Sequence, residues 1–166
     1  MALTQERAFA RSEVIKKGTI SYDFHVSLEV GTHYSGLSEL TFDLLKIPAE
    51  LAIDFKSKDI KTVVVNGQVT PLAQEDGFIL LDVTKLKEGT NKVGVHYHNK
   101  YDNDGSGCVS FTDVDGKQYL YTQFESYFAN RVLALFDQPD LKATMRLNVI
   151  SPSTWKKVLS NEYATI

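Results

Sequence analysis

One segment of the chain combines side chains that could bind a polar, cationic ligand. If residues 118–125 form a strand, alternation places two phenols, an amide and a carboxylate on one face, those of Tyr119, Tyr121, Gln123 and Glu125. Such a face is unusual in a protein core, because each buried polar group needs a hydrogen-bonding partner. The pattern is typical of a cleft lining. It is equally typical of a strand end at which Glu125 pairs with Arg131 after a turn.

Two further patterns are compatible with metal binding. In the expected strand 92–98, His96 and His98 point to the same face, a spacing that zinc can use. A zinc site needs a third ligand, and the other two histidines, His25 and His33, lie in segments of unknown register. The alternative interpretation is two imidazoles that face solvent on an open sheet.

The acidic segment from Asp102 to Asp113 resembles a calcium-binding loop in its spacing. Carboxylate or hydroxyl oxygens occupy loop positions 1, 3 and 5, Gly107 occupies position 6 and Asp113 position 12. Two features argue against calcium: the flanking segments are predicted strands rather than helices, and position 12 has Asp instead of the longer Glu. The alternative is a polar, glycine-rich connection between two strands.

The sequence contains no motif for an assembled catalytic centre. A Gly-x-Ser-x-Gly nucleophile turn, a phosphate-binding glycine loop ahead of a helix and a His-Glu-x-x-His zinc motif are all absent. Cys108 has no histidine at a spacing that suggests a catalytic pair. Taken alone, these 166 residues are therefore not expected to form a complete catalytic centre.

The elements that must position these residues are predicted to be β-strands. Apolar and polar residues alternate strictly over 19–30, and a second strand follows over 37–45 with Leu40, Phe42 and Leu44 inward. Gly36 is interpreted as a bulge at which the phase slips. Further strands are expected at 51–55, 60–65, 68–72, 78–82, 92–98, 118–125 and 141–150.

Turns and termini agree with an all-β domain. Asn66-Gly67 predicts a tight hairpin, because both residues tolerate positive φ. Asp76-Gly77 indicates another turn, and residues 3–11 predict one short helix with Thr4 as its N-cap. Turns at intervals of 8–12 residues favour one domain built as a sandwich, barrel or saddle-shaped sheet.

Composition excludes several classes of protein. The chain has 18 Lys+Arg against 21 Asp+Glu and a net charge of -3, so it lacks the basic surface typical of nucleic-acid or anionic-membrane binding. No window approaches the ~20 apolar residues that span a bilayer. Cys108 is the only cysteine, which excludes an intrachain disulfide. With no signal-peptide pattern in the first residues, a cytoplasmic location is expected.

Three stretches together resemble the N-terminal domain of M1-family zinc aminopeptidases. They are Tyr-Leu-Tyr-Thr-Gln-Phe-Glu at 119–125, Ala-Asn-Arg at 129–131 and Phe-Asp-Gln-Pro-Asp-Leu-Lys-Ala-Thr at 136–144. The similarity extends over nearly the whole chain, and the opening segment 3–8 is most similar to the soluble bacterial aminopeptidase N branch. In that family this domain is a saddle-like, mainly antiparallel β-structure, in agreement with the alternation found here.

The resemblance also implies roles for two residues. The position matched by Glu125 carries a carboxylate that binds the α-ammonium group of a peptide substrate, and the position matched by Gln123 lines the pocket for the first side chain. The zinc ion, its ligands and the remaining catalytic groups would belong to the next domain of the same polypeptide. We therefore expect residues 1–161 to form the N-terminal domain and 162–166 to begin the catalytic domain. The isolated chain is expected to be inactive.

The sequence departs from the family pattern in two places. The segment Arg131 to Phe136 lacks a second Arg and a Pro-Cys, and residues 107–111 replace a common Gly-Leu-x-Arg-Phe run. Neither departure changes Gln123 or Glu125. The competing interpretation is a free-standing β-sandwich module that binds protein or carbohydrate through Tyr119, Tyr121 and Gln123.

Overall fold

The computed structural model describes residues 3–57 and 59–162 and contains three β-sheets with one α-helix. The largest sheet has the order β11 (Ala143–Ile150), β1 (Ile20–Leu28), β2 (His33–Leu44), β8 (Gly89–Lys100), β4 (Ile60–Val65), β5 (Gln68–Thr70). The second consists of β3 (Ala52–Asp54), β7 (Phe78–Leu80) and β6 (Gln74–Glu75), and the third of β10 (Gln118–Gln123) and β9 (Gly107–Thr112). All strand pairs are antiparallel except β1 with β11. The expected all-β, mainly antiparallel class is confirmed.

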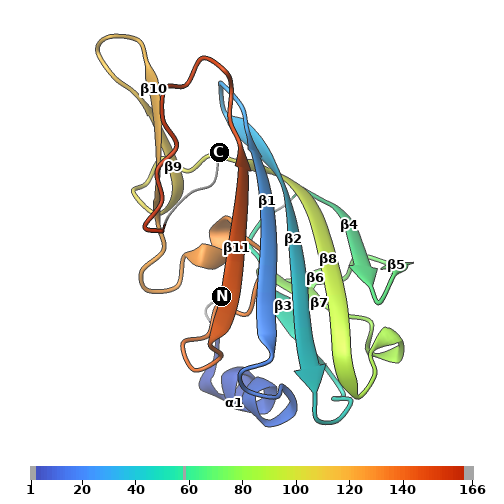
Figure 1. Cartoon of the computed structure of the whole chain (residues 1–166). Helices are drawn as coiled ribbons and strands as arrows, with labels where there is room; N and C mark the ends of the chain where they lie inside the picture. The colour runs from blue at the N-terminus through green and yellow to red at the C-terminus, as the bar shows by residue number, and fades with distance from the viewer. Residues whose placement is uncertain (1–2, 58, 163–166) are drawn as a thin grey trace.

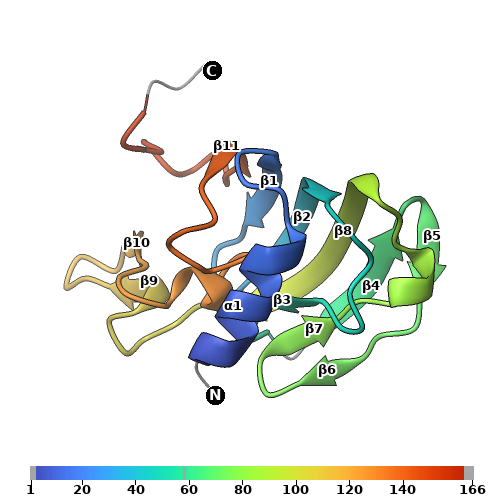
Figure 2. The same ribbon diagram turned by 90° about the horizontal axis from the view of Figure 1, so that it is seen from below.

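The small elements cover one side of the large sheet. Figure 2 shows helix α1 (Gln5–Val14) and the three-stranded sheet on the same side of the curved six-stranded sheet. The β9–β10 hairpin lies beyond the β11 edge, and the 3₁₀ turn Ala129–Arg131 lies between that hairpin and the large sheet (Figure 1). The segment from the end of β10 to the start of β11 therefore passes next to α1 before it joins the large sheet.

The alternating apolar residues of the large sheet form the core. On β1, Tyr22 and Phe24 are buried while Asp23 and His25 lie on the opposite face. The three residues expected to point inward from the second strand are all buried. They pack with residues of β8, β4 and β3, among them Val93, Val95, Val63, Val65 and Ile53. Alternation by itself thus identified the buried face of the main sheet.

The interpretation of Gly36 as a bulge is wrong. Strand β2 begins at His33, and its pairing runs through Gly36 without a shift, with Val26 and Tyr97 opposite. The buried ring of Tyr97 lies across Gly36, in the space that a Cβ atom would occupy. The glycine is therefore explained by close approach of a side chain from the neighbouring strand rather than by a change of phase.

We expect the substitution Gly36→Ala to lower the free energy of unfolding by about 2–3 kcal/mol, because the added methyl group overpacks a buried aromatic ring. The matched control is Gly94→Ala on β8, where a Cβ would meet Val64 and Leu37 only at 3.9 and 4.0 Å. The control should stay within about 0.5 kcal/mol of wild type. Urea denaturation of the three proteins measures the difference, and equal stability of the two variants would contradict this explanation of Gly36.

The predicted turns and the helix are confirmed, with shifted ends. Thr4 caps α1 by accepting a hydrogen bond from the Arg7 amide at 3.2 Å. Asn66 and Gly67 both have positive φ and join β4 to β5 as a two-residue hairpin. The sequence did not predict the short strands β6 and β9, the second of which occupies part of the expected acidic loop. No helix in the described residues has the length and apolarity needed to cross a membrane.

Candidate functional site

Glu125 and Gln123 lie together at the end of β10. The predicted strand ends at Gln123, two residues earlier than expected, so Glu125 lies in the turn that follows. The Glu125 backbone amide donates a hydrogen bond to Oε1 of Gln123 at 3.0 Å. Both side chains are exposed, and no described residue donates a hydrogen bond to the Glu125 carboxylate or forms an ion pair with it. This carboxylate is therefore available to a cation from outside the described residues.

The expected alternative of an ion pair between Glu125 and Arg131 is wrong. The guanidinium of Arg131 binds Oδ1 of Asp102 at 2.8 Å and both carboxylate oxygens of Asp104 at 3.0–3.1 Å. These hydrogen bonds from Arg131 lower the pKa of Asp104, whereas burial raises the pKa of Asp102 in spite of its arginine partner. The positive charge next to the turn is thus already balanced by two carboxylates.

The same contacts account for the acidic loop. Asp102 and Asp104 were expected to occupy calcium positions 1 and 3, but both bind Arg131. Oδ2 of Asp102 also accepts a hydrogen bond from the Cys108 amide at 2.9 Å. Residues 107–112 of this segment form strand β9. The loop is therefore closed by an arginine from a later turn, which agrees with the polar-connection interpretation.

An aromatic patch, defined as Phe111, Tyr119 and Tyr121, lies on the exposed face of the β9–β10 hairpin. Phe111 stacks on Tyr119 with ring centroids 5.2 Å apart and meets Tyr121 edge-on at 6.4 Å. All three rings are 43–47% exposed. Leu120, which alternates with the two tyrosines, packs against the core instead. The predicted phenol face is confirmed for these two tyrosines.

The histidines do not gather into one site. His96 is exposed, and His98 stacks on His33 with ring centroids 4.9 Å apart. Within residues 3–57 and 59–162, the one group of three potential ligand side chains with mutually close atoms is Asp23, His25 and Glu39. It lies on the face of β1 and β2 that points away from the core, and it includes neither His96 nor His98.

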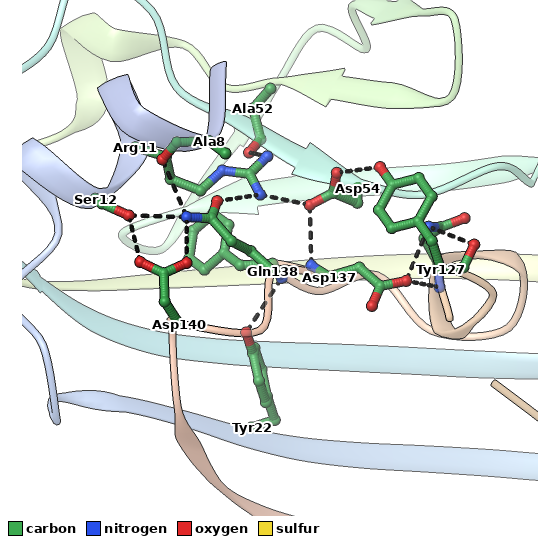
Figure 3. Close-up of polar contacts among 12 residues, drawn as sticks. Ala8, Arg11, Ser12, Tyr22, Ala52, Asp54, Tyr127, Asp137, Gln138 and Asp140 are labelled. Carbon is green, nitrogen blue, oxygen red and sulfur yellow. Dashed lines mark hydrogen bonds and ion pairs between the residues drawn. The ribbon is translucent and has the colours of Figure 1, made fainter. Parts of the chain in front are cut away.

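A buried carboxylate, Asp54, organises the polar interior between α1 and the segment that follows β10. Its side chain is 0% exposed. Oδ2 of Asp54 accepts hydrogen bonds from Arg11 at 2.7 Å and from the Asp137 amide at 3.0 Å, and Oδ1 accepts one from the Tyr127 hydroxyl at 2.7 Å (Figure 3). We call Arg11, Asp54, Tyr127 and Asp137 the Asp54 cluster. It joins a helix, a strand of the small sheet and the turn that carries Glu125.

Gln138 and Asp140 attach this segment to the helix. The Gln138 amide donates to the Ala8 carbonyl at 3.0 Å and to the Ser12 hydroxyl at 2.8 Å, and Ser12 donates to Asp140 at 2.8 Å (Figure 3). The Phe-Asp-Gln-Pro-Asp stretch, which carries much of the family resemblance, therefore has a structural role. In the sequence, the residue that could have indicated this polar interior is Asp54, a charged residue within an apolar strand. Its ionic partner, Arg11, lies 43 residues earlier.

Asn130 belongs to the Ala-Asn-Arg stretch at 129–131, directly before the segment that departs from the family pattern. It is fully buried, and its backbone amide and its Nδ2 donate to Oδ2 of Asp137 at 3.0 and 2.8 Å. Its carbonyl accepts a hydrogen bond from the Lys56 amide at 2.8 Å, and the carbonyl of Arg131 accepts one from Asn99 at 2.7 Å. Asn130 thus holds in place the C-terminal end of the turn that follows β10, the end away from Glu125.

Comparison with known sequences identifies relatives among bacterial and archaeal aminopeptidases. The family model described as the peptidase M1 N-terminal domain matches residues 18–165. Aminopeptidase N of Streptomyces lividans is 34% identical over 161 residues, which cover 96% of this chain and 19% of that protein. A probable aminopeptidase 1 of Saccharolobus solfataricus is 26% identical over 147 residues, covering 89% of this chain and 17% of the relative. The chain thus spans about a fifth or less of the length of these relatives.

Comparison with solved structures supports the same fold. A leukotriene A4 hydrolase from Saccharomyces cerevisiae matches with a TM-score of 0.68 and 16% identity, over 85% of this chain and 24% of the hydrolase. An M1 zinc metallopeptidase from Deinococcus radiodurans, solved with a Tyr-Ser-Ala substrate, matches with a TM-score of 0.61 and 18% identity over 83% of this chain and 34% of the peptidase.

Proposed function

Because this chain belongs to the family of M1 peptidase N-terminal domains, we propose that it is the substrate-binding N-terminal domain of a zinc-dependent aminopeptidase that releases N-terminal amino acids from peptides. The observation that carries the proposal is the Glu125 carboxylate. It is exposed beside Gln123 and has no ion-pair partner within the described residues, while the nearby Arg131 is bound by Asp102 and Asp104.

Under this proposal Glu125 selects the end of a peptide. A carboxylate attracts a protonated α-amine far more strongly than a neutral amide, most of all once the site is closed off from water. Holding the ammonium group determines which peptide bond lies over the reacting groups, and this positioning contributes to catalysis. Gln123 would line the pocket for the first side chain.

The described residues do not provide the zinc site of such an enzyme. Their one cluster of three potential ligands, Asp23, His25 and Glu39, lies on the outward face of the sheet, and the sequence has no His-Glu-x-x-His motif. We assign zinc to a catalytic domain that follows in the same polypeptide. Exposed apolar side chains on β11 and after it, such as Leu147, Ile150 and Leu159, support a contact with that domain.

The proposed domain boundary lies at the end of the chain. Residues 1–161 would form this domain, and 162–166 would begin the catalytic domain; residues 163–166 are outside the described part of the structure. The cytoplasmic location, and the absence of nucleic-acid or membrane partners, stay predictions from the sequence.

The native polypeptide provides the direct test. An antibody raised against this chain should detect a product several times heavier than 18.6 kDa in cell extract. That product should hydrolyse a peptide with a free N-terminus, leave the Nα-acetylated peptide intact and lose activity when a chelator removes zinc. A product of 18.6 kDa without peptidase activity would contradict the proposal. The exposed aromatic patch would then favour a module that binds protein or carbohydrate.

A further inference from the structure

We propose that Tyr127 is a positioning residue for Glu125, and that its hydrogen bond to the buried Asp54 holds the turn from which the Glu125 carboxylate projects. The inference rests on the proposed function, because it assigns to Tyr127 an effect on the binding of the substrate's ammonium group. Tyr127 itself would act through Glu125 and not by touching the zinc ion or the substrate.

The buried carboxylate that anchors Tyr127 is fixed in place. Oδ1 of Asp54 accepts the Tyr127 hydroxyl at 2.7 Å, while Oδ2 is held by Arg11 and by the Asp137 amide. Asp54 is 0% exposed and belongs to strand β3, so the acceptor cannot move toward solvent. Burial and the hydrogen bond to Asp54 raise the pKa of Tyr127, and its hydroxyl therefore remains protonated as the donor.

The Glu125 side chain depends on its turn for its position. Within the described residues its carboxylate makes no hydrogen bond or ion pair, so the conformation of the turn determines where the charge lies. The C-terminal end of this turn is attached to the rest of the domain by hydrogen bonds to the carbonyls of Asn130 and Arg131. On the near side, Phe124 packs against the hydrophobic core, and Tyr127 supplies the hydrogen bond to the polar interior, only two residues from Glu125, a span of at most about 7 Å.

The hydroxyl group of Tyr127 restricts the backbone conformations of the turn. Without it, the ring of Tyr127 keeps its contact with Lys56, whose Nζ lies 5.0 Å from the ring centroid. The turn, however, loses its only hydrogen bond to Asp54 and gains backbone conformations that must be given up again when the ammonium group binds. Since small misplacements of a binding group reduce catalysis strongly, we expect an effect on substrate use that exceeds the effect on folding.

The test uses the full-length enzyme with the substitution Tyr127→Phe. We expect kcat/KM for a peptide substrate to fall about tenfold, mainly through a higher KM. Tyr22→Phe is the matched control: its hydroxyl also makes a hydrogen bond to the interior, accepting from the Phe136 amide at 3.1 Å, but Tyr22 lies on β1 and not in the turn. The control should keep the wild-type kcat/KM. An equal loss in both variants would show general loosening and would overturn the proposal.

A double-mutant cycle separates positioning from a structural effect. If Tyr127 acts through Glu125, adding Tyr127→Phe to Glu125→Ala should change kcat/KM by less than about twofold. A further tenfold loss in the Glu125→Ala background would overturn the role of Tyr127 and leave the proposed function intact. If Glu125→Ala itself has no effect, the assignment of Glu125 fails, and the inference about Tyr127 fails with it.

Discussion

Replacement of Glu125 by alanine in the full-length polypeptide is expected to lower kcat/KM for a peptide with a free N-terminus by about 100-fold or more. The substitution removes a charge-assisted contact to the α-ammonium group, and such contacts are among the strongest hydrogen bonds in proteins. The domain should fold normally, because the exposed carboxylate makes no hydrogen bond or ion pair with other described residues. Steady-state kinetics on one dipeptide amide, with the variant and the wild type at the same zinc loading, measure the loss.

Two further variants test whether the loss of activity comes from the charge of Glu125 in particular. Glu125→Gln retains the size and the hydrogen-bonding capacity of the side chain but not its charge, and it should lose most of the same activity if charge selects the ammonium group. Glu13→Ala removes another exposed carboxylate, on α1, and should leave kcat/KM unchanged. Wild-type activity of Glu125→Ala would refute the assignment of this residue while leaving the family membership untouched.

The second large effect is expected for stability. Arg11→Ala should lower the free energy of unfolding by about 3–5 kcal/mol, because it leaves the charge of Asp54 buried without its ionic partner. Arg11 is 3% exposed and also donates to the Ala52 carbonyl at 3.0 Å, so its removal leaves a second buried acceptor unsatisfied. Chemical denaturation of the 166-residue chain, monitored by fluorescence of Trp155 and far-UV circular dichroism, measures the change.

Arg7 supplies the matched control on the same helix, one turn earlier. Its ion pair with Glu50, at 3.3 Å, is partly exposed, and its guanidinium lies 4.3 Å from the centre of the Phe78 ring. Arg7→Ala should therefore cost at most about 1–2 kcal/mol. If the two alanine variants were equally stable, the buried pair between Arg11 and Asp54 would not be a main stabilising contact of this domain.

The class of fold and much of its local geometry follow from the amino-acid sequence alone. Strict alternation identified the buried face of β1, because side chains of a strand point to opposite faces whatever the neighbouring strand is. Asn66-Gly67 determined a hairpin, since the turn depends on the φ values of those two residues alone. Family resemblance assigned roles to Gln123 and Glu125, which stay predictions, and in the structure the Glu125 amide donates a hydrogen bond to the Gln123 side chain.

The partners of the polar residues, in contrast, are known from the three-dimensional packing and not from the sequence. Arg131 was an equally good partner for Glu125 in sequence terms, yet it binds Asp102 and Asp104, the latter 27 residues earlier. Asp54 joins Arg11 across 43 residues and Tyr127 across 73. Gly36 is required by the ring of Tyr97 on another strand. Alternation and turn preference are properties of neighbouring residues, whereas these contacts depend on how distant segments pack, and no local pattern records that packing.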